Sequence, residues 1–225
     1  MGGQACVLYG AAEFSRDLDL ALLIEPENLR RLDAVLDELD AHSIAVPPFD
    51  TQYLARGHAV HFRCQHSDVR GLRIDVMSKL RGVDDFPSLW SRRTVLQTED
   101  GVEFNLLSLA DLVKAKKTQR DKDWPMIRRL MEAHYFQSRL SPREGHLQFW
   151  LLELRTPELL IEIANDHKAL AKDVANARPL LRFASAGDLP SLTAAVEDEE
   201  RLERERDRLY WEPLKRELAQ LRRRR

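Results

Sequence analysis

Two aspartates separated by one residue, Asp17 and Asp19, stand at the start of an apolar run that ends at residue 24. The run predicts a strand over residues 17–24, in which residues i and i+2 point to the same face. Both carboxylates would then project together, with their Cα atoms about 6.5 Å apart. Like charges directed at one point repel, so a hard divalent cation that prefers oxygen ligands is one expected occupant. The alternative is a solvated strand edge.

A glycine pair, Gly2 and Gly3, precedes this strand and opens a segment, residues 3–10, that is expected to form a short helix. Glycines lack Cβ, so their backbone N–H groups can approach a phosphate closely, and a following helix N-terminus favours an anion. The glycines would therefore suit a phosphate site. The other interpretation is a flexible start of the chain.

A third carboxylate, Asp75, lies between apolar residues in the segment Gly-Leu-Arg-Ile-Asp-Val-Met at 71–77. The alternation predicts a strand. Asp75 is then either an exposed-face residue of that strand or a third acid that joins Asp17 and Asp19.

A basic segment follows Ser108, which together with Asp111 matches a Ser-x-x-Asp capping box. This motif predicts a helix that starts at Leu109. Lys116 and Arg120 are four residues apart and would share one helix face, where they could meet a triphosphate or a nucleic-acid backbone. A solvated helix end rich in cations is the alternative.

Asp123 closes this basic segment. It is expected to orient Arg120 or Lys122, or to open the next helix, and the sequence does not separate these roles.

Taken together, Gly-Gly, Asp-x-Asp and a third Asp on a later strand resemble the pattern of the DNA polymerase β-type nucleotidyltransferase superfamily. The pattern is most similar to that of the minimal and abortive-infection (AbiEii-like) nucleotidyltransferases of bacteria. Residues 108–123 are similar to the helix of this family that ends in a Lys…Arg-x-Lys-Asp signature. The resemblance covers about residues 1–135.

The resemblance implies roles for the matching residues. The acids, which would bind Mg²⁺ or Mn²⁺ and carry catalysis, are Asp17, Asp19 and Asp75. The residues that would bind the nucleotide are Gly2, Gly3, Ser15, Lys116 and Arg120. Asp75 would also help to deprotonate the attacking hydroxyl.

The chain departs from the family in two places. Relatives often carry an arginine shortly before the acid pair, where this chain has Glu13, and Arg16 is the nearest base. The family also usually supplies a helix before the glycines, whereas here they follow Met1 directly. The nucleotidyltransferase domain is therefore expected to lack that helix, or to begin upstream.

Composition limits the remaining choices. The 225 residues include 35 Lys and Arg against 37 Asp and Glu, so no overall basic field indicates a passive RNA coat. No apolar run reaches the length of about 18 residues that a membrane span needs, and residues 1–15 lack a charged segment followed by an apolar one, so neither a membrane span nor a signal peptide is expected. The two cysteines are too few for a disulfide framework and suit a reducing cytoplasm.

The expected fold is α/β (α+β): a small mixed sheet flanked by helices, followed by a helical region. Domain 1–135 would be the nucleotidyltransferase and 136–225 the helical part. Further strands are expected at 58–64, 69–77, 94–97 and 102–105, a turn at 84–87, and helices at 27–39, 108–119, 122–135, 142–153, 157–177 and 190–222.

The last segment, residues 200–225, carries ten basic and six acidic side chains and ends in Arg222–Arg225. Mixed charges at helical spacing are typical of a solvated, salt-bridged helix. The arginine end could grip RNA phosphates or act as a solubilising tail, and Tyr210 and Trp211 could dock the helix onto the body.

These features predict a cytoplasmic enzyme that moves a nucleotide monophosphate from an NTP to an acceptor hydroxyl. Three accounts of the acceptor remain open. It is RNA, such as a tRNA 3′ end, in a toxin of a toxin–antitoxin or phage-defence system; or it is a protein, such as a cognate antitoxin. In the third account the chain is a binding module that has lost turnover.

Overall fold

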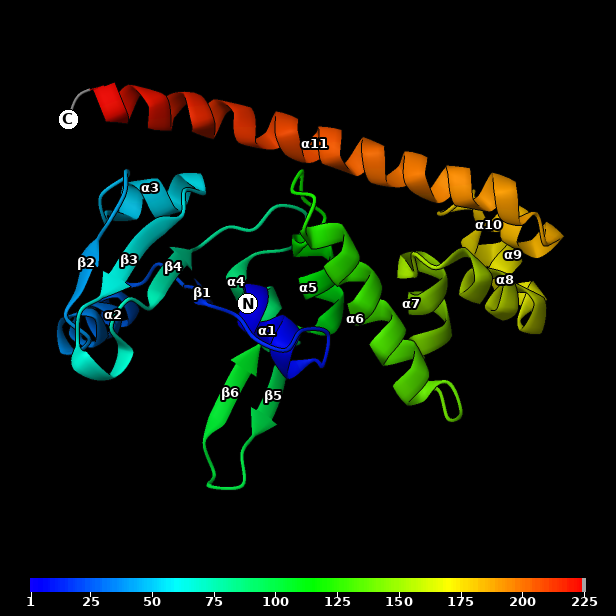
Figure 1. The fold of residues 1–225 in the computed structure, drawn as a ribbon, viewed down its shortest axis with the longest axis horizontal. Helices are drawn as coiled ribbons and strands as arrows, with labels where there is room; N and C mark the ends of the chain where they lie inside the picture. Colours follow the sequence, from blue (N-terminus) through cyan, green and yellow to red (C-terminus); the bar gives the residue numbers. More distant parts are fainter. Residues whose placement is uncertain (224–225) are drawn as a thin grey trace. The chain divides into compact units, whose positions relative to one another are not determined.

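The computed structural model describes residues 1–223 and contains a mixed α/β region followed by helices (Figure 1). The residues form two compact units. Unit 1 holds residues 1–115 and the residues from 209 onward, and unit 2 holds residues 116–208. The boundary expected near residue 136 falls inside unit 2, within helix α6 (Asp123–Ser138).

Unit 1 is built on a four-stranded sheet with the order β1-β4-β3-β2. The strands are β1 (Asp17–Ala21), β2 (Ala41–Ser43), β3 (Val60–Cys64) and β4 (Arg73–Met77). Strands β1 and β4 run parallel, whereas β4 with β3 and β3 with β2 are antiparallel. The small mixed sheet is therefore confirmed, with β1 at one edge.

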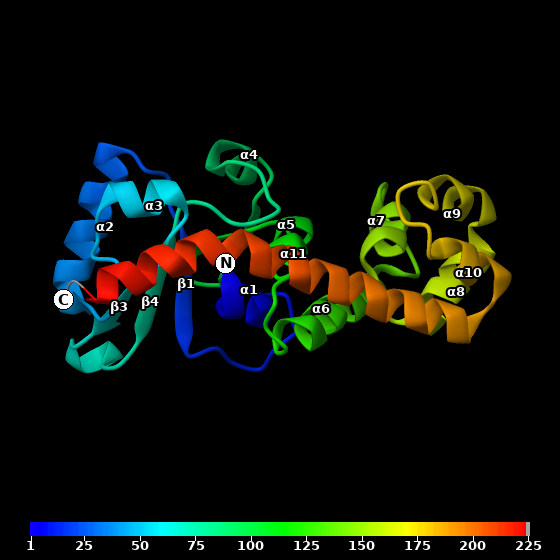
Figure 2. The same cartoon turned by 90° about the horizontal axis from the view of Figure 1, so that it is seen from above.

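The remaining elements of unit 1 flank this sheet or form a separate hairpin (Figures 1 and 2). They are α1 (Gly2–Leu8), α2 (Pro26–Glu38), α3 (Thr51–Arg56), a 3₁₀ turn at Ser67–Val69, α4 (Phe86–Ser91), the antiparallel pair β5 (Thr94–Gln97) and β6 (Glu103–Leu106), and α5 (Leu109–Ala115).

Alternation along the strands divides the sheet into two chemically different faces. Leu18, Ile74 and Val76 belong to the cluster that packs against Leu36 of α2 and Leu54 of α3. The residues between them on β1 and β4 must point to the other face, because successive strand side chains alternate. The acids thus lie on the face opposite this core.

Unit 2 contains α6, α7 (His146–Glu153), α8 (Pro157–Asp166), α9 (Lys168–Val174), α10 (Leu181–Ala186) and the first part of α11 (Leu189–Arg223). The buried Arg178 donates to the carbonyls of Leu151 and Leu154 at 2.8 and 2.9 Å, and pairs with Glu199. It therefore satisfies carbonyl groups at the C-terminal end of α7, which no intrahelical N–H can reach.

Several expected elements needed correction. The helix predicted over 108–119 ends at Ala115, and that over 157–177 is broken at His167, whose backbone leaves the helical region. The turn expected at 84–87 instead starts α4, because the Asp85 side chain accepts a hydrogen bond from the Ser88 N–H. The short elements β2, α3 and α10 were not predicted.

The C-terminal part of α11 that belongs to unit 1 packs beside α3. Glu217 accepts from Arg56 and contacts the buried His58 at 2.8 Å. A Cβ on Gly57 would lie 3.4 Å from the Tyr210 hydroxyl. Of the arginine tail, Arg224 and Arg225 lie outside the described residues. No helix among residues 1–223 is long and apolar enough to cross a membrane.

Candidate functional site

The glycine pair and the second acid lie together at the start of α1. The Gly3 N–H donates to Asp19 Oδ2 at 3.2 Å, and the Met1 ammonium donates to the Asp19 carbonyl at 2.8 Å. A Cβ placed on Gly2 would lie 1.9 Å from Asp19 Oδ2. Only a residue without a side chain fits there, so the structure brings together Gly2, Gly3 and Asp19.

Ser15 covers the same end of α1. A Cβ on Gly3 would lie 2.2 Å from Ser15 Oγ, and this hydroxyl donates to the Asp17 carbonyl at 3.1 Å. Gln4 donates through Nε2 to the Ser15 carbonyl at 3.0 Å. The loop that leads into β1 is thereby held against α1, with the hydroxyl beside the glycines.

The three acids occupy one face of the parallel pair β1–β4. Asp19 is directly opposite Asp75 in the register, and Asp17 is opposite Arg73. Residues opposite each other on neighbouring strands lie about 5 Å apart and project to the same side of a sheet. The expectation that Asp75 shares a face with Asp17 and Asp19 therefore agrees with the strand register.

Two residues not predicted as site residues hold Asp75. Asp75 Oδ1 lies 2.8 Å from His61 Nδ1 and accepts from Arg73 Nε at 2.7 Å. Burial alone would raise the pKa of Asp75, but the hydrogen bonds from His61 and Arg73 outweigh it and lower the pKa. Asp75 is therefore a carboxylate at neutral pH.

The signal that could have found His61 and Arg73 is strand pairing. His61 is opposite Asp75 across the antiparallel pair β3–β4, and Arg73 precedes Asp75 by two residues on the same face. The hydrogen bond to Asp75 raises the pKa of Arg73 although burial opposes it, and the charges of Asp75, Asp17 and Asp19 add to the rise. The charged form of Arg73 is therefore stabilised by all three carboxylates.

The acids fit a hard divalent cation in their donor chemistry, because carboxylate oxygens are the ligands that Mg²⁺ and Mn²⁺ prefer. Gly2 has no side chain, and the Asp19 carboxylate occupies the space that a Cβ of Gly2 would take. Among residues 1–223, no three His, Cys, Asp or Glu side chains are already grouped to hold a metal ion. In this structure Asp75 is paired with Arg73 instead.

Lys116 and Arg120 do not share a helix face, which corrects the prediction from their spacing. Both lie in the turn between α5 and α6 and meet at the buried Asp123. Lys116 Nζ donates to Asp123 Oδ1 at 3.2 Å, and Arg120 Nε donates to Asp123 Oδ2 at 2.7 Å. The Thr118 hydroxyl donates to the same oxygen at 2.5 Å.

This arrangement shows that Asp123 both orients Arg120 and opens α6. The Lys116 side chain is only 11% exposed, whereas that of Arg120 is 57% exposed. Arg120 can thus contact a ligand without leaving Asp123. Lys116 and Arg120 belong to unit 2, so the structure does not place them with the acids of unit 1.

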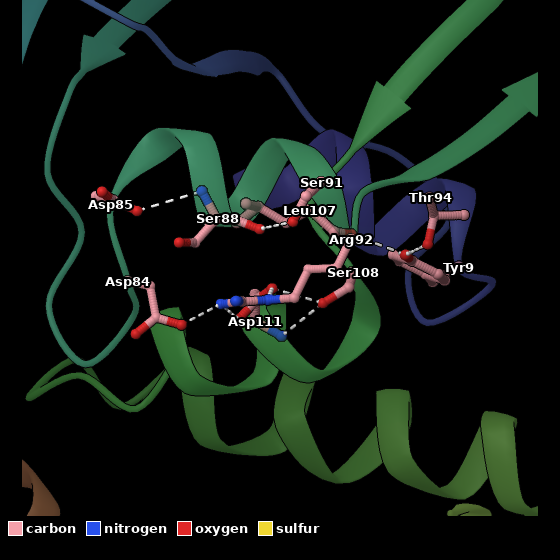
Figure 3. Close-up of polar contacts among 10 residues, drawn as sticks. All are labelled: Tyr9, Asp84, Asp85, Ser88, Ser91, Arg92, Thr94, Leu107, Ser108 and Asp111. Atoms are coloured by element: carbon pink, nitrogen blue, oxygen red, sulfur yellow. Dashed lines mark hydrogen bonds and ion pairs between the residues drawn. The ribbon is translucent and has the colours of Figure 1, made fainter. Parts of the chain in front are cut away.

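A second polar cluster joins α4 to the start of α5 (Figure 3). The Asp111 N–H donates to Ser108 Oγ at 3.2 Å, so Ser108 caps the helix as predicted. The Asp111 carboxylate accepts from the Ser108 hydroxyl and not from the Ser108 backbone N–H, so the capping box is only half formed. Arg92 holds both oxygens of the buried Asp111 at 2.7 and 2.8 Å and also pairs with Asp84.

Tyr9 ties α1 to the hairpin in the same region (Figure 3). Its hydroxyl lies 2.7 Å from Thr94 Oγ1 and donates to the Leu107 carbonyl at 2.8 Å. All groups of this cluster are satisfied within unit 1, and it therefore serves to position α1 and α5.

Comparison of the chain with protein-family models, with curated proteins and with solved structures found no match.

Proposed function

We propose that this chain is a metal-dependent nucleotidyltransferase that moves a nucleotide monophosphate from an NTP to an acceptor hydroxyl. One observation carries the proposal: the glycine pair packs against Asp19, and Asp19 lies directly opposite Asp75. A phosphate-binding backbone and paired carboxylates are the two parts that phosphoryl chemistry with a hard cation needs.

In this proposal, separate residues of unit 1 would bind the phosphates and the metal ions. The N–H groups of Gly2 and Gly3, together with the Ser15 hydroxyl, would bind the β- and γ-phosphates. Divalent cations held by Asp17, Asp19 and Asp75 would supply the Lewis acidity that neutralises charge on the phosphates. The resemblance also implies nucleotide-binding roles for Arg120 and Lys116, which belong to unit 2.

The reaction balances without a further co-reactant. The acceptor oxygen forms a bond to the α-phosphorus as the bond to the β-phosphate oxygen breaks and pyrophosphate leaves. Asp75 accepts the proton of the acceptor hydroxyl. In the metal-free protein the lowered pKa of Asp75 keeps this group deprotonated at neutral pH.

The resemblance to the DNA polymerase β-type superfamily, and to its AbiEii-like branch, suggests the acceptor. The proposed acceptor is RNA, such as a tRNA 3′ end, and the helices of unit 2 would recognise it. A toxin of this kind arrests growth when it is expressed, and a cognate antitoxin would be its partner.

The test is transfer of label from each α-³²P-labelled NTP, with Mg²⁺ or Mn²⁺, to components of a cell lysate. We expect nuclease-sensitive label that is lost in Asp17→Asn and in Asp19→Asn but kept in Glu13→Gln, a nearby exposed acid. Protease-sensitive label would instead identify a protein acceptor. Label that persists in both acid variants would contradict the proposal.

A non-catalytic binding module is the second candidate, and the Arg73–Asp75 contact favours it. A carboxylate oxygen already shared by a guanidinium and an imidazole is poorly available to a metal. Partner capture that is unchanged by EDTA and by Asp19→Asn, with no label transferred by the wild-type chain, would support the module.

A further inference from the structure

Arg73 is a fixed positive charge on the acid face. It stands opposite Asp17 in the strand register, and its Nε donates to Asp75 Oδ1 at 2.7 Å. The groups that face Asp75 are His61 from β3, Arg73 from its own strand, and Asp19 directly opposite on β1. Asp75 therefore contacts one guanidinium and one imidazole, while Asp17 and Asp19 lie beside it on the same face.

We propose that Arg73 is a built-in counter-cation: it holds Asp75 in the metal-free protein and must release it before a divalent cation binds. This inference rests on the proposed function in one respect, namely that the acid face is a metal site. It adds a residue that sets how readily the site accepts metal.

The chemistry of the Arg73–Asp75 contact indicates that Arg73 and a divalent cation compete for Asp75. An arginine is protonated at every pH of interest, so its charge cannot be removed and the side chain has to move. A divalent cation within a few ångströms of a guanidinium is repelled by it, as like charges are. Asp75 Oδ1 therefore binds either Arg73 or the metal.

The surroundings allow such an exchange. The Arg73 side chain is 37% exposed, so its guanidinium can turn into solvent without burying a charge elsewhere. His61 Nδ1 lies 2.8 Å from Asp75 Oδ1 and 3.1 Å from an Arg73 amino group. One ring nitrogen can donate to the carboxylate or accept from the arginine, but it cannot do both. The three-way contact is therefore readily rearranged.

Arg63 provides a matched control. It pairs with Arg73 across β3 and β4 and is exposed on the same face. Arg63→Gln removes the same charge type one strand further from Asp19. A difference between the two variants would therefore report the contact with Asp75 and not a general change in surface charge.

The experiment is a Mn²⁺ titration of the nucleotide-free full-length chain, followed by the EPR signal of free Mn²⁺. A neighbouring positive charge favours the ionised form of a carboxyl group by a factor of about 10 to 1,000. If Arg73 competes with the metal for Asp75 with a similar strength, removing it strengthens metal binding, so we expect Arg73→Gln to bind Mn²⁺ at least about tenfold more tightly. Arg63→Gln should stay within about threefold of wild type, because exposed charges are screened. Loss of structure lowers affinity and cannot imitate a gain.

Two further variants keep the test decisive. Arg73→Met retains the apolar stem and should give the same gain, whereas Arg73→Lys retains the charge and should bind Mn²⁺ less tightly than Arg73→Gln. If wild type binds Mn²⁺ through Asp19, as shown by loss in Asp19→Asn, and the uncharged variants bind no more tightly, the role of Arg73 is refuted while the metal site stands. If neither wild type nor Arg73→Gln binds Mn²⁺ without nucleotide, the role of Arg73 is refuted, whereas the proposed function is decided by the label-transfer experiment.

Discussion

Asp19 lies directly opposite Asp75 on the neighbouring parallel strands β1 and β4, on the face of the sheet that the α2–α3 core does not cover. Like charges placed directly across a strand pair are destabilising. Two hydrogen bonds offset this repulsion: Arg73 on the same face donates to Asp75, and the Gly3 N–H donates to Asp19. A pair of acids kept at such a cost is typical of a functional site.

Gly2→Ala should disable the phosphate end of the site. The new Cβ would lie 1.9 Å from Asp19 Oδ2, and the Gly2 φ of 69° is in the left-handed region that alanine avoids. We expect affinity for an NTP, measured by calorimetry with Ca²⁺ to prevent turnover, to fall at least about tenfold, since a lost charge-assisted contact is worth about 1.5–3 kcal/mol.

Gly82→Ala is the control for this prediction. Gly82 has a similar φ of 78°, but no atom lies within 4 Å of its added Cβ. It carries the same backbone strain without the clash. Equal NTP affinities for Gly2→Ala and Gly82→Ala would mean that Asp19 and the glycine do not form a nucleotide site.

Asp111→Ala should destabilise unit 1 strongly, and Asp84→Ala only slightly. The Asp111 side chain is 1% exposed and binds Arg92 through both oxygens, whereas the Asp84 side chain, which also pairs with Arg92, is 65% exposed (Figure 3). Removing one partner of a buried pair costs about 3–5 kcal/mol, whereas an exposed ion pair is worth at most about 1 kcal/mol.

Chemical denaturation of the two variants measures this difference in the free energy of unfolding. Because Arg92 keeps contact with water, we place the Asp111→Ala loss at the lower end, about 3 kcal/mol. Similar midpoints for Asp111→Ala and Asp84→Ala would show that the Asp111 contact does not hold α5 in place.

Much of the acid face was predictable because a strand has a period of two residues. Once β1 and β4 are strands, Asp17 and Asp19 must share a face. Asp75 must point to the other side of the sheet from its buried neighbours Ile74 and Val76. The contacts of Asp75 with His61 and Arg73 were not predictable in the same way. They depend on the register between strands, which the spacing along one strand does not contain.

The basic segment shows a different limit. The four-residue spacing of Lys116 and Arg120 predicts one helix face, yet α5 ends at Ala115. The helix stops because side-chain contacts replace its backbone ladder: Thr118 and Arg120 both turn to Asp123, and the Trp124 indole donates to the Thr118 carbonyl. Such local side-chain hydrogen bonds compete with the helix and end its periodicity.

The variants Lys116→Met and Arg120→Gln should separate a structural role from a role in nucleotide binding. Lys116 is a nearly buried partner of Asp123, so its loss should cost unit 2 about 2 kcal/mol of stability. Arg120→Gln should cost at most about 1 kcal/mol, because this side chain is mostly exposed. The role that the resemblance implies for Arg120 predicts that this variant also binds an NTP less tightly. Denaturant unfolding and calorimetry provide the two measurements. Unchanged NTP affinity in Arg120→Gln would remove this residue from the nucleotide site.

His134 should make unit 2 less stable as the pH falls from 6.5 toward 4. Burial, with a smaller contribution from the charge of His146, lowers the pKa of His134 from its ordinary 6.5 to about 4. His134 Nδ1 also accepts a hydrogen bond from the Trp150 indole at 2.8 Å, which requires the neutral ring. Between these pH values the unfolded chain binds a proton that the folded chain does not, so stability rises with pH across this window and is fully present above pH 6.5. The shift corresponds to at most about 3 kcal/mol, reduced by the partial exposure of the ring.

His134→Asn keeps an acceptor for Trp150 and removes the titration, so its stability should change less between pH 7 and pH 4.5 than that of wild type. NMR titration of the His134 ring in the folded protein measures the pKa directly, and a value near 6.5 would contradict this account.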